Sequence, residues 1–188
     1  MGAHFIVISG IPGSGKSTLG RIIANAFNIP ILDKDVILEY LFENLGVGNA
    51  EWRTKLSRLA DEELRKQAGT QTSAVLTSWW RHPRSESTSG TSIEWLQALP
   101  GELVEVYCSC SPSVAATRFL ARQRHVGHLD FQYTYAALLE SFEQQARLGP
   151  LATGRIIQVN TEITPGIAEI EARIFGIPTE VACAKTAA

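Results

Sequence analysis

A glycine-rich segment near the start of the chain has the residue types and spacing of a phosphate-binding loop. Gly10, Gly15, Lys16 and Ser17 occupy the fixed positions of the pattern glycine, four residues, glycine, lysine, then serine or threonine. Glycines allow successive backbone N–H groups to curl around a phosphate that side chains would keep away. Lys16 brings a cation to the β- and γ-phosphates, and the Ser17 hydroxyl is the expected protein ligand of Mg²⁺.

The segments on either side of this loop supply the structural setting that the motif requires. The apolar run 5–8 is typical of a central parallel strand, and apolar residues recur at helical spacing over 19–27. This setting favours binding of ATP and Mg²⁺ over the alternative, a strand–helix turn with an incidental lysine. The loop residues expected to bind the nucleotide are Gly10, Pro12, Gly13, Ser14, Gly15, Lys16, Ser17 and Thr18.

Two carboxylates follow the second predicted strand. Asp33 and Asp35 come directly after the short run 31–32, and the carboxyl ends of parallel strands line the ligand crevice of such sheets. One carboxylate could orient an acceptor hydroxyl and accept its proton, while the other could hold water on Mg²⁺. The alternative is an N-cap at the start of the next helix. We assign Asp35 to catalysis and acceptor binding, and Asp33 to the metal.

Three arginines form a second candidate group. Arg118 and Arg122 are four residues apart and share one helix face, and Arg124 follows where the helical pattern breaks. Three guanidinium groups could therefore converge on one site. A mobile arginine that closes on the γ-phosphate neutralises the charge that develops in the transition state. The alternative is a solvated basic face that pairs with acidic side chains.

The third predicted strand is followed by an aromatic and basic segment at the same sheet edge. Trp79, Trp80 and Arg81 could bind the acceptor, with a flat ring or sugar stacked on the indoles and an anionic group paired with an arginine. The alternative is that the tryptophans pack under the long loop. We expect His125 and His128 to be exposed and assign them no catalytic role.

Alternating apolar runs predict one α/β domain over 1–176, with a three-layer, doubly wound sheet of five parallel strands. The tail 177–188 shows no periodicity and is predicted to be flexible. The expected strands are 5–8, 31–32, 74–76, 103–108 and 155–159. The expected helices are 19–27, 36–45, 52–64, 112–123, 135–142 and a last helix that begins at Thr164-Pro165.

These motifs together resemble the P-loop kinases of small molecules, a group that includes shikimate, gluconate and adenylylsulfate kinases, chloramphenicol phosphotransferase and zeta-type toxins. The resemblance covers about residues 4–175 and implies a nucleoside monophosphate kinase-like fold with a helical lid at about 118–135. It implies that Asp35 binds or deprotonates the acceptor. It also gives Arg122 and Arg124 the role of lid arginines on the γ-phosphate, and Arg118 a contact with adenine.

The chain departs from many P-loop proteins at the end of the third strand. Where those proteins carry an aspartate, this chain reads Leu76-Thr77-Ser78-Trp79. The resemblance then leaves Mg²⁺ to Ser17, water molecules and Asp33.

Composition narrows the classes of partner. The 188 residues include 17 Lys and Arg against 19 Asp and Glu, so no basic field recruits nucleic acid or anionic lipid. No apolar run approaches the roughly 20 residues of a membrane-spanning helix, and the start of the chain does not resemble a signal peptide. We expect a cytoplasmic protein without a disulfide framework, present as a monomer or homodimer.

The sequence therefore predicts an ATP-dependent kinase that phosphorylates a hydroxyl of a metabolite, sugar, nucleoside or antibiotic. One alternative is a nucleotide-binding switch or assembly ATPase that acts on a protein partner. Another is a polynucleotide or tRNA kinase, which the nearly even charge disfavours.

Overall fold

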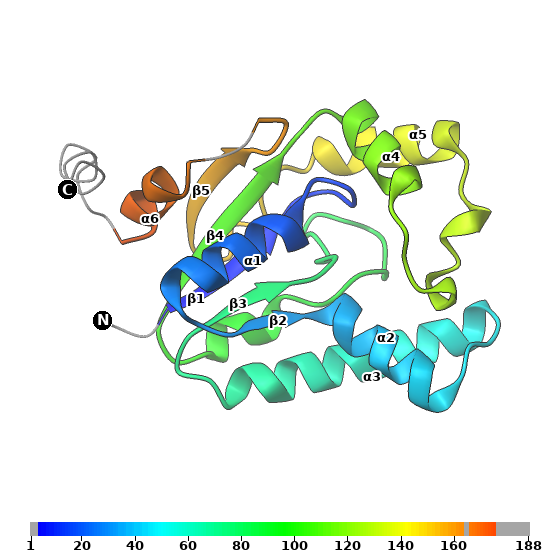
Figure 1. Cartoon of the computed structure of the whole chain (residues 1–188), viewed down its shortest axis with the longest axis horizontal. Coiled ribbons are helices and arrows are strands. Elements are labelled where there is room, and N and C mark those ends of the chain that lie inside the picture. Colours follow the sequence, from blue (N-terminus) through cyan, green and yellow to red (C-terminus); the bar gives the residue numbers. More distant parts are fainter. Residues whose placement is uncertain (1–3, 164–165, 176–188) are drawn as a thin grey trace.

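A five-stranded parallel sheet forms the centre of the molecule in the computed structural model, which describes residues 4–163 and 166–175 (Figure 1). The strand order is β2-β3-β1-β4-β5, and every neighbouring pair is parallel. The strands are β1 (His4–Ser9), β2 (Ile31–Asp33), β3 (Ala74–Thr77), β4 (Glu102–Ser109) and β5 (Arg155–Asn160). The predicted doubly wound α/β fold is confirmed.

Helices cover both faces of this sheet because successive side chains of a buried strand point to opposite sides. Ile6 and Ile8 of β1 pack in one core with the apolar faces of α1 (Lys16–Phe27) and α6 (Ile167–Phe175). Phe5 and Val7 pack in a second core with α3 (Ala50–Gly69). The continuous apolar run of β1 therefore reflects burial on both faces.

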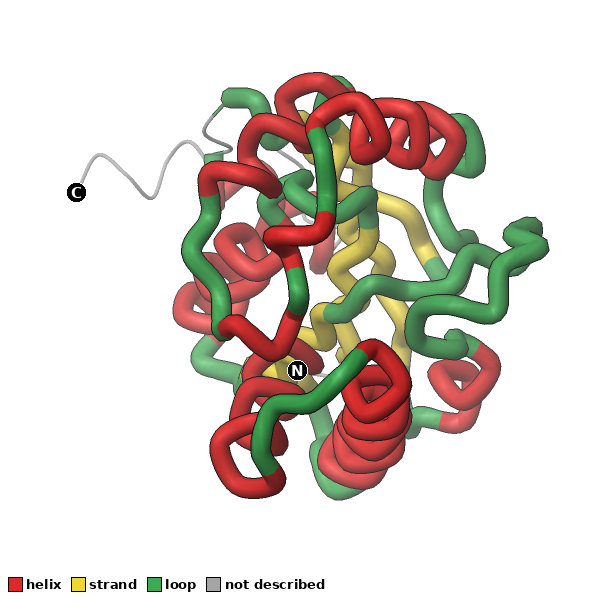
Figure 2. Tube along the Cα trace, turned by 90° about the vertical axis from the view of Figure 1, so that its right-hand side faces the viewer, coloured by secondary structure: helices red, strands yellow, loops and turns green. Residues whose placement is uncertain are grey.

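The remaining helices frame the carboxyl ends of the strands, which Figure 2 turns toward the viewer. They are α2 (Lys34–Leu45), α4 (Pro112–Ala121) and α5 (Tyr135–Ala146), with short 3₁₀ helices η1 (Glu94–Ala98), η2 (Val126–His128) and η3 (Asp130–Gln132). Helix α4 ends before the predicted boundary at 123 because Arg122 has an extended backbone, with φ −74° and ψ 142°. None of the described helices is long and apolar enough to cross a membrane.

The segment between α4 and α5 leaves the body of the domain and approaches α2 (Figure 1). It coincides with most of the predicted lid and contains η2 and η3. His128 Nε2 lies 2.9 Å from Glu39 Oε1, and its ring packs edge-on against Phe42. Contacts with α2 therefore hold this segment, which is the predicted lid, near the carboxyl end of the sheet. The predicted start of the last helix at Thr164-Pro165 and the predicted tail 177–188 lie outside the described residues.

A buried polar cluster ties the long loop after β3 to α2 and α3. Lys34 Nζ lies 2.7 Å from Asp61 Oδ1 and donates to Thr91 Oγ1 at 3.2 Å. Thr91 Oγ1 in turn donates to Asp61 Oδ1 at 2.6 Å and lies 2.5 Å from Ser78 Oγ. These contacts with α2 and α3 hold the two ends of the loop, at Ser78 and Thr91. The loop between them is largely exposed.

Candidate active site

The predicted phosphate-binding loop lies between β1 and α1 with a backbone that only glycine fits. Gly13 has φ 80°, and a Cβ atom there would lie 2.2 Å from the carbonyl oxygen of Ala115. Gly10 has φ 129°, and a Cβ atom there would lie 2.5 Å from the carbonyl oxygen of Cys108. The loop therefore packs directly against β4 and α4, which is why these positions tolerate no side chain.

Lys16 turns its ammonium group back into this loop. Its Nζ atom donates to the carbonyl oxygens of Gly10 at 2.9 Å and Ile11 at 3.0 Å. Burial lowers the pKa of Lys16 from its usual value to about 8. The ammonium group therefore lies at the loop, and the dipoles of two backbone carbonyls offset only part of the cost of burying its charge. Anionic phosphate oxygens would compensate it better.

Asp33 and Asp35 differ sharply in environment although one residue separates them. Asp33 is buried and caps α2, where its Oδ1 accepts from the N–H of Asp35 at 3.0 Å. Burial and the neighbouring Asp35 charge raise the pKa of Asp33, and the hydroxyls of Ser17 and Thr77 partly oppose this. The N-cap alternative therefore holds for Asp33. The cap uses one carboxylate oxygen and does not exclude a second role.

The donor set beside Asp33 fits a hard divalent cation. Ser17 and Asp33 line the same small cavity, which also contains Thr77 at the end of β3. Hydroxyl and carboxylate oxygens are the protein ligands that Mg²⁺ accepts while it keeps water and phosphate oxygens. Among the described residues, no group of three or more His, Cys, Asp or Glu side chains could hold a metal.

The small cavity, with a volume of about 130 Å³, brings the other predicted groups together. Asp35 lines it, half exposed, with Arg124 Nη2 2.6 Å from its Oδ2 atom. Burial by itself would raise the pKa of Asp35, but Arg124, His128, Arg122 and Lys16 outweigh it and hold this pKa below its ordinary value. The carboxylate is therefore ionised at neutral pH.

Two of the three predicted arginines reach this cavity. Arg122 Nη2 and Arg124 Nη1 each lie 3.2 Å from Asp130 Oδ2, so one lid carboxylate holds both guanidinium groups. Arg118 donates instead to the carbonyl oxygen of Thr161 at 3.0 Å and does not line the cavity. The expected convergence of three guanidinium groups is wrong, because Arg122 ends α4 and leaves the face that it was predicted to share with Arg118.

The tandem tryptophans face in different directions. Trp79 is 46% exposed, lines the small cavity and donates from its indole Nε1 to Gln145 Oε1 at 3.2 Å. Trp80 is 6% exposed, donates to the carbonyl oxygen of Ile8 at 2.9 Å and packs against Trp95. Of the two alternatives that the sequence left open, packing in the core therefore holds for Trp80.

Other residues at the site were missed or misplaced by the sequence reasoning. Arg53 of α3 and Asp130 of the lid line the small cavity, and no local pattern marks either residue. His128 was expected to be exposed but is 1% exposed, and burial and Arg124 lower its pKa. Arg81 lies outside the small cavity and donates to the carbonyl oxygen of Gly90 at 3.2 Å.

The fold and the phosphate-binding loop define the class as the P-loop kinases of small molecules. Comparison with family models gives a match to adenylylsulphate kinase over residues 2–122, which is more than half of the chain. The protein therefore belongs to the adenylylsulphate kinase family. The matched region contains the loop, both aspartates and Arg122, and it ends before Arg124 and the rest of the lid.

Individual relatives match over shorter stretches or at lower identity. Shikimate kinase from Corynebacterium diphtheriae is 53% identical over 36 residues, which are 19% of this chain and 21% of that protein. The chain thus matches only about a fifth of the length of that curated relative. A kinase candidate from Chloroflexus aurantiacus has a TM-score of 0.76 at 24% identity, covering 95% of this chain and 100% of its own. Shikimate kinase from Bacteroides thetaiotaomicron has a TM-score of 0.55 at 18% identity, covering 94% and 97% of the two chains. The solved structures show the shared fold.

Proposed function

We propose that the protein transfers the γ-phosphoryl group of ATP to a hydroxyl group of a small molecule. The observation that carries this proposal is the placement of Lys16, Asp35 and Arg124 around one cavity at the carboxyl edge of the sheet. A phosphate-binding loop alone would indicate only a nucleotide. An ionised carboxylate between that loop and a lid arginine also provides a place for an acceptor hydroxyl.

Each group has a role that follows from its surroundings. Asp35 orients the acceptor hydroxyl and accepts its proton as transfer proceeds, because its carboxylate is ionised and half exposed. Lys16, Arg122 and Arg124 stabilise charge on the transferred group. Nucleotide binding falls to Gly10, Pro12, Gly13, Ser14, Gly15, Lys16, Ser17 and Thr18, with Arg118 at the adenine.

Ser17 and Asp33 would hold Mg²⁺, which supplies charge neutralisation on the β- and γ-phosphate oxygens when it is bound. Trp79 also lines the small cavity and would contact the acceptor there. Trp80 is buried in the core, and Arg81 lines a second cavity instead of the small one. The cytoplasmic location and the monomeric or homodimeric state remain expectations from the sequence.

The deciding experiment incubates the protein with ATP, Mg²⁺ and a panel of metabolites, sugars, nucleosides and antibiotics, and detects phosphorylated products by mass spectrometry. We expect one chemical class to give a monophosphorylated product. A folded protein that binds ATP but phosphorylates no member of the panel would contradict the proposal. ATP hydrolysis without any acceptor would instead favour a nucleotide-dependent switch.

A further inference from the structure

Thr91, near the end of the long loop after β3, is fully buried and lies at the centre of the polar cluster described above. Its hydroxyl donates to Asp61 Oδ1 at 2.6 Å. It also lies 3.2 Å from Lys34 Nζ and 2.5 Å from Ser78 Oγ. A hydroxyl has one proton and two acceptor lone pairs. Because its proton goes to Asp61, both other groups donate to it, and the hydroxyl uses its full hydrogen-bonding capacity.

The cluster joins three segments that each supply a side chain to the small cavity. Asp35 comes from α2, Arg53 from α3 and Trp79 from the segment after β3. The three partners of the Thr91 hydroxyl belong to the same three segments. Thr91 and its two charged partners line neither the small cavity nor the second cavity. The cluster can therefore influence an acceptor only through the residues beside it.

The contact between Thr91 and Lys34 fixes the direction of Asp35. Lys34 is 7% exposed, and its ammonium group is held by Thr91 and Asp61. Successive residues of an α-helix lie about 100° apart around its axis. With the Lys34 side chain anchored, the first turn of α2 cannot rotate, and the next residue, Asp35, faces the small cavity. The orientation of Asp35 therefore depends on a side chain from another face of its helix.

The backbone of Thr91 fixes the position of Trp79. Its N–H donates to the carbonyl oxygen of Trp79 at 2.8 Å, and its carbonyl oxygen accepts from the N–H of Arg81 at 2.8 Å. Gly90 makes this close approach possible, because it has φ 88° and a Cβ atom there would lie 2.9 Å from the Trp79 carbonyl oxygen. Thr91 thus holds the segment from which Trp79 reaches the small cavity.

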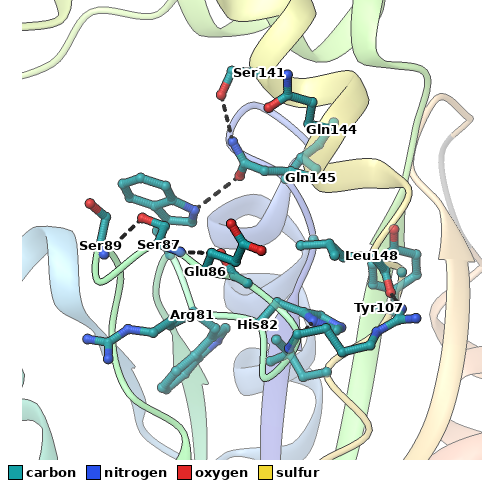
Figure 3. Close-up of a pocket in the computed structure, with 18 residues that line it drawn as sticks. Arg81, His82, Glu86, Ser87, Ser89, Tyr107, Ser141, Gln144, Gln145 and Leu148 are labelled. Carbon is teal, nitrogen blue, oxygen red and sulfur yellow. Dashed lines mark hydrogen bonds between the residues drawn. The ribbon is translucent and has the colours of Figure 1, made fainter.

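The same loop forms one wall of the second cavity, which has a volume of about 450 Å³. Figure 3 shows Ser87 of the loop on one side of this cavity and Gln144 of α5 on the other. Trp79 lines both cavities, and its indole donates to Gln145 Oε1 at 3.2 Å. Because Thr91 holds one end of the loop, its position affects both cavities.

Stability alone is a weak reason for this cluster. Burial of Lys34 beside Asp61 removes both charges from water, and apolar residues of similar volume often give equal or greater stability. An apolar replacement would not reproduce the directions that hydrogen bonds impose on the groups they join. The cluster therefore fits a role in which the relative placement of Asp35 and Trp79 matters.

We propose that Thr91 is a positioning residue of the acceptor site. Its hydroxyl sets the direction of Asp35 through Lys34, and its backbone sets the position of Trp79. The carboxylate and the indole that would contact the acceptor are thereby held in one fixed arrangement. The inference rests on the proposed kinase function, because that function assigns both groups to one acceptor.

The test separates the two contacts of Thr91 by their effects on kcat and on the acceptor KM. Thr91→Val keeps the shape and the backbone contacts but removes the hydroxyl. We expect kcat to fall by about 10- to 100-fold while the acceptor KM stays within about threefold. Gly90→Ala should instead push the backbone away from Trp79, so the acceptor KM should rise by about fivefold or more and kcat should change less. Thr91→Ser restores the hydroxyl and should recover kcat to within about twofold.

Thr153→Val is the matched control for the loss of a buried threonine hydroxyl. The Thr153 hydroxyl has no hydrogen-bond partner among the residues that the structure describes, so this variant should leave kcat and KM unchanged. If Thr91→Val does not fold, the double variant Lys34→Met/Asp61→Leu removes the same anchor without leaving a buried charge unpaired. It should show the same fall in kcat. Urea unfolding and the ATP dissociation constant, expected within about twofold of the original, verify that each variant is folded.

A second measurement needs no turnover. In ¹H–¹⁵N spectra of the full chain, the Asp35 amide signal should move in Thr91→Val, and the Trp79 indole signal should move in Gly90→Ala. Both should stay near their original positions in Thr153→Val. Unchanged kcat in Thr91→Val, no recovery in Thr91→Ser, or unmoved signals in both variants would overturn the inference. If no acceptor is found but the signals move as expected, the kinase proposal alone fails.

Discussion

Arg124 Nη2 lies 2.6 Å from Asp35 Oδ2, so a lid arginine contacts the carboxylate proposed to receive the acceptor hydroxyl. Asp130 of the lid holds the same guanidinium group from the other side, with its Oδ2 3.2 Å from Arg124 Nη1. Arg124 therefore bridges the segment between α4 and α5 and the first turn of α2. A γ-phosphate at the loop would compete with Asp35 for this guanidinium group and free the carboxylate for the acceptor.

Replacing Asp35 with asparagine should separate nucleotide binding from transfer. We expect Asp35→Asn to keep the ATP dissociation constant within about threefold while kcat falls by about 10²- to 10⁴-fold, the usual contribution of a positioned general base. Isothermal titration with ATP and a steady-state assay on the acceptor found by the panel measure the two quantities. Lys16→Met is the contrasting variant and should lose both ATP binding and transfer. Unchanged kcat in Asp35→Asn would remove the proposed role.

Removing Arg124 should raise the pKa of Asp35. Arg124 is the strongest of the charges that oppose burial, so its loss in Arg124→Ala should make Asp35 titrate at a higher pH. The carboxyl ¹³C shift of Asp35 measures this directly. Arg118→Ala is the matched control, because Arg118 contacts the Thr161 carbonyl and should leave the titration unchanged. The same shift in both variants would contradict a specific Arg124–Asp35 pair.

The sign of the associated stability change follows from the lowered pKa. Asp35 binds its proton less tightly in the folded protein than in the unfolded chain, so the pair stabilises the fold above the ordinary aspartate pKa of about 3.9. This contribution is lost as pH falls through the lower folded value. Arg124→Ala should therefore reduce the free energy of unfolding at neutral pH and have little effect in strong acid.

ATP affinity should weaken in mildly alkaline solution because Lys16 has a pKa of about 8. Phosphate binding requires the ammonium form, so the dissociation constant should be flat below about pH 7.5 and rise by up to about tenfold per pH unit above pH 8. Titration calorimetry from about pH 6 to about pH 10 checks this. Lys16→Arg keeps its positive charge over this range, so the rise in the dissociation constant above pH 8 should disappear. If the rise persisted in Lys16→Arg, a group other than Lys16 would cause it.

The two adjacent tryptophans should differ in their effect on stability. Trp80→Ala removes a buried indole from the core and should lower the free energy of unfolding by about 3 to 5 kcal/mol. Trp79→Ala, at a half-exposed position, should change it by less than about 1 kcal/mol and should raise the acceptor KM instead. Urea unfolding of both variants measures the difference. Similar losses of stability would contradict the distinct environments assigned to them.

The parts of the fold that the sequence predicted are those with a local signal. Continuous apolar runs such as 5–8 marked the strands because both faces of the sheet are buried. The phosphate-binding loop was recognisable because Gly13 and Gly10 must lie against carbonyl oxygens of neighbouring elements. In each case the pattern itself is local and can be recognised in the sequence, although the contacts that impose it come from distant segments such as Cys108 and Ala115.

Features that depend on contacts between distant segments could not be predicted in this way. Lys34 lies between two acids in the sequence, yet its partner is Asp61 on another helix. The sequence around His128 suggests an exposed loop histidine, but in the folded protein its ring is buried and lies beside Glu39 of α2. Trp79 and Trp80 are adjacent, and only the exit of the chain from β3 decides which indole enters the core. These contacts join residues that are far apart in the chain, so no local pattern in the sequence predicts them.

Glu105 of β4 offers a test of the buried contacts beside the phosphate-binding loop. Its fully buried carboxylate accepts from Ser9 Oγ at 2.5 Å, and from the N–H groups of Leu151 at 2.7 Å and Thr153 at 3.4 Å. Glu105→Ala would leave these buried donors without a partner. We therefore expect the free energy of unfolding to fall by about 3 kcal/mol.

Glu102→Ala is the matched control on the same strand. Its half-exposed carboxylate pairs with Arg155 at 3.0 Å, and an exposed ion pair contributes less than about 1 kcal/mol. Urea unfolding curves of the two variants compare the two environments directly. We propose that the Glu105 carboxylate stabilises the contact between the loop before β5 and Ser9, the residue that precedes the phosphate-binding loop. If Glu105→Ala were no more destabilising than Glu102→Ala, this role would be wrong.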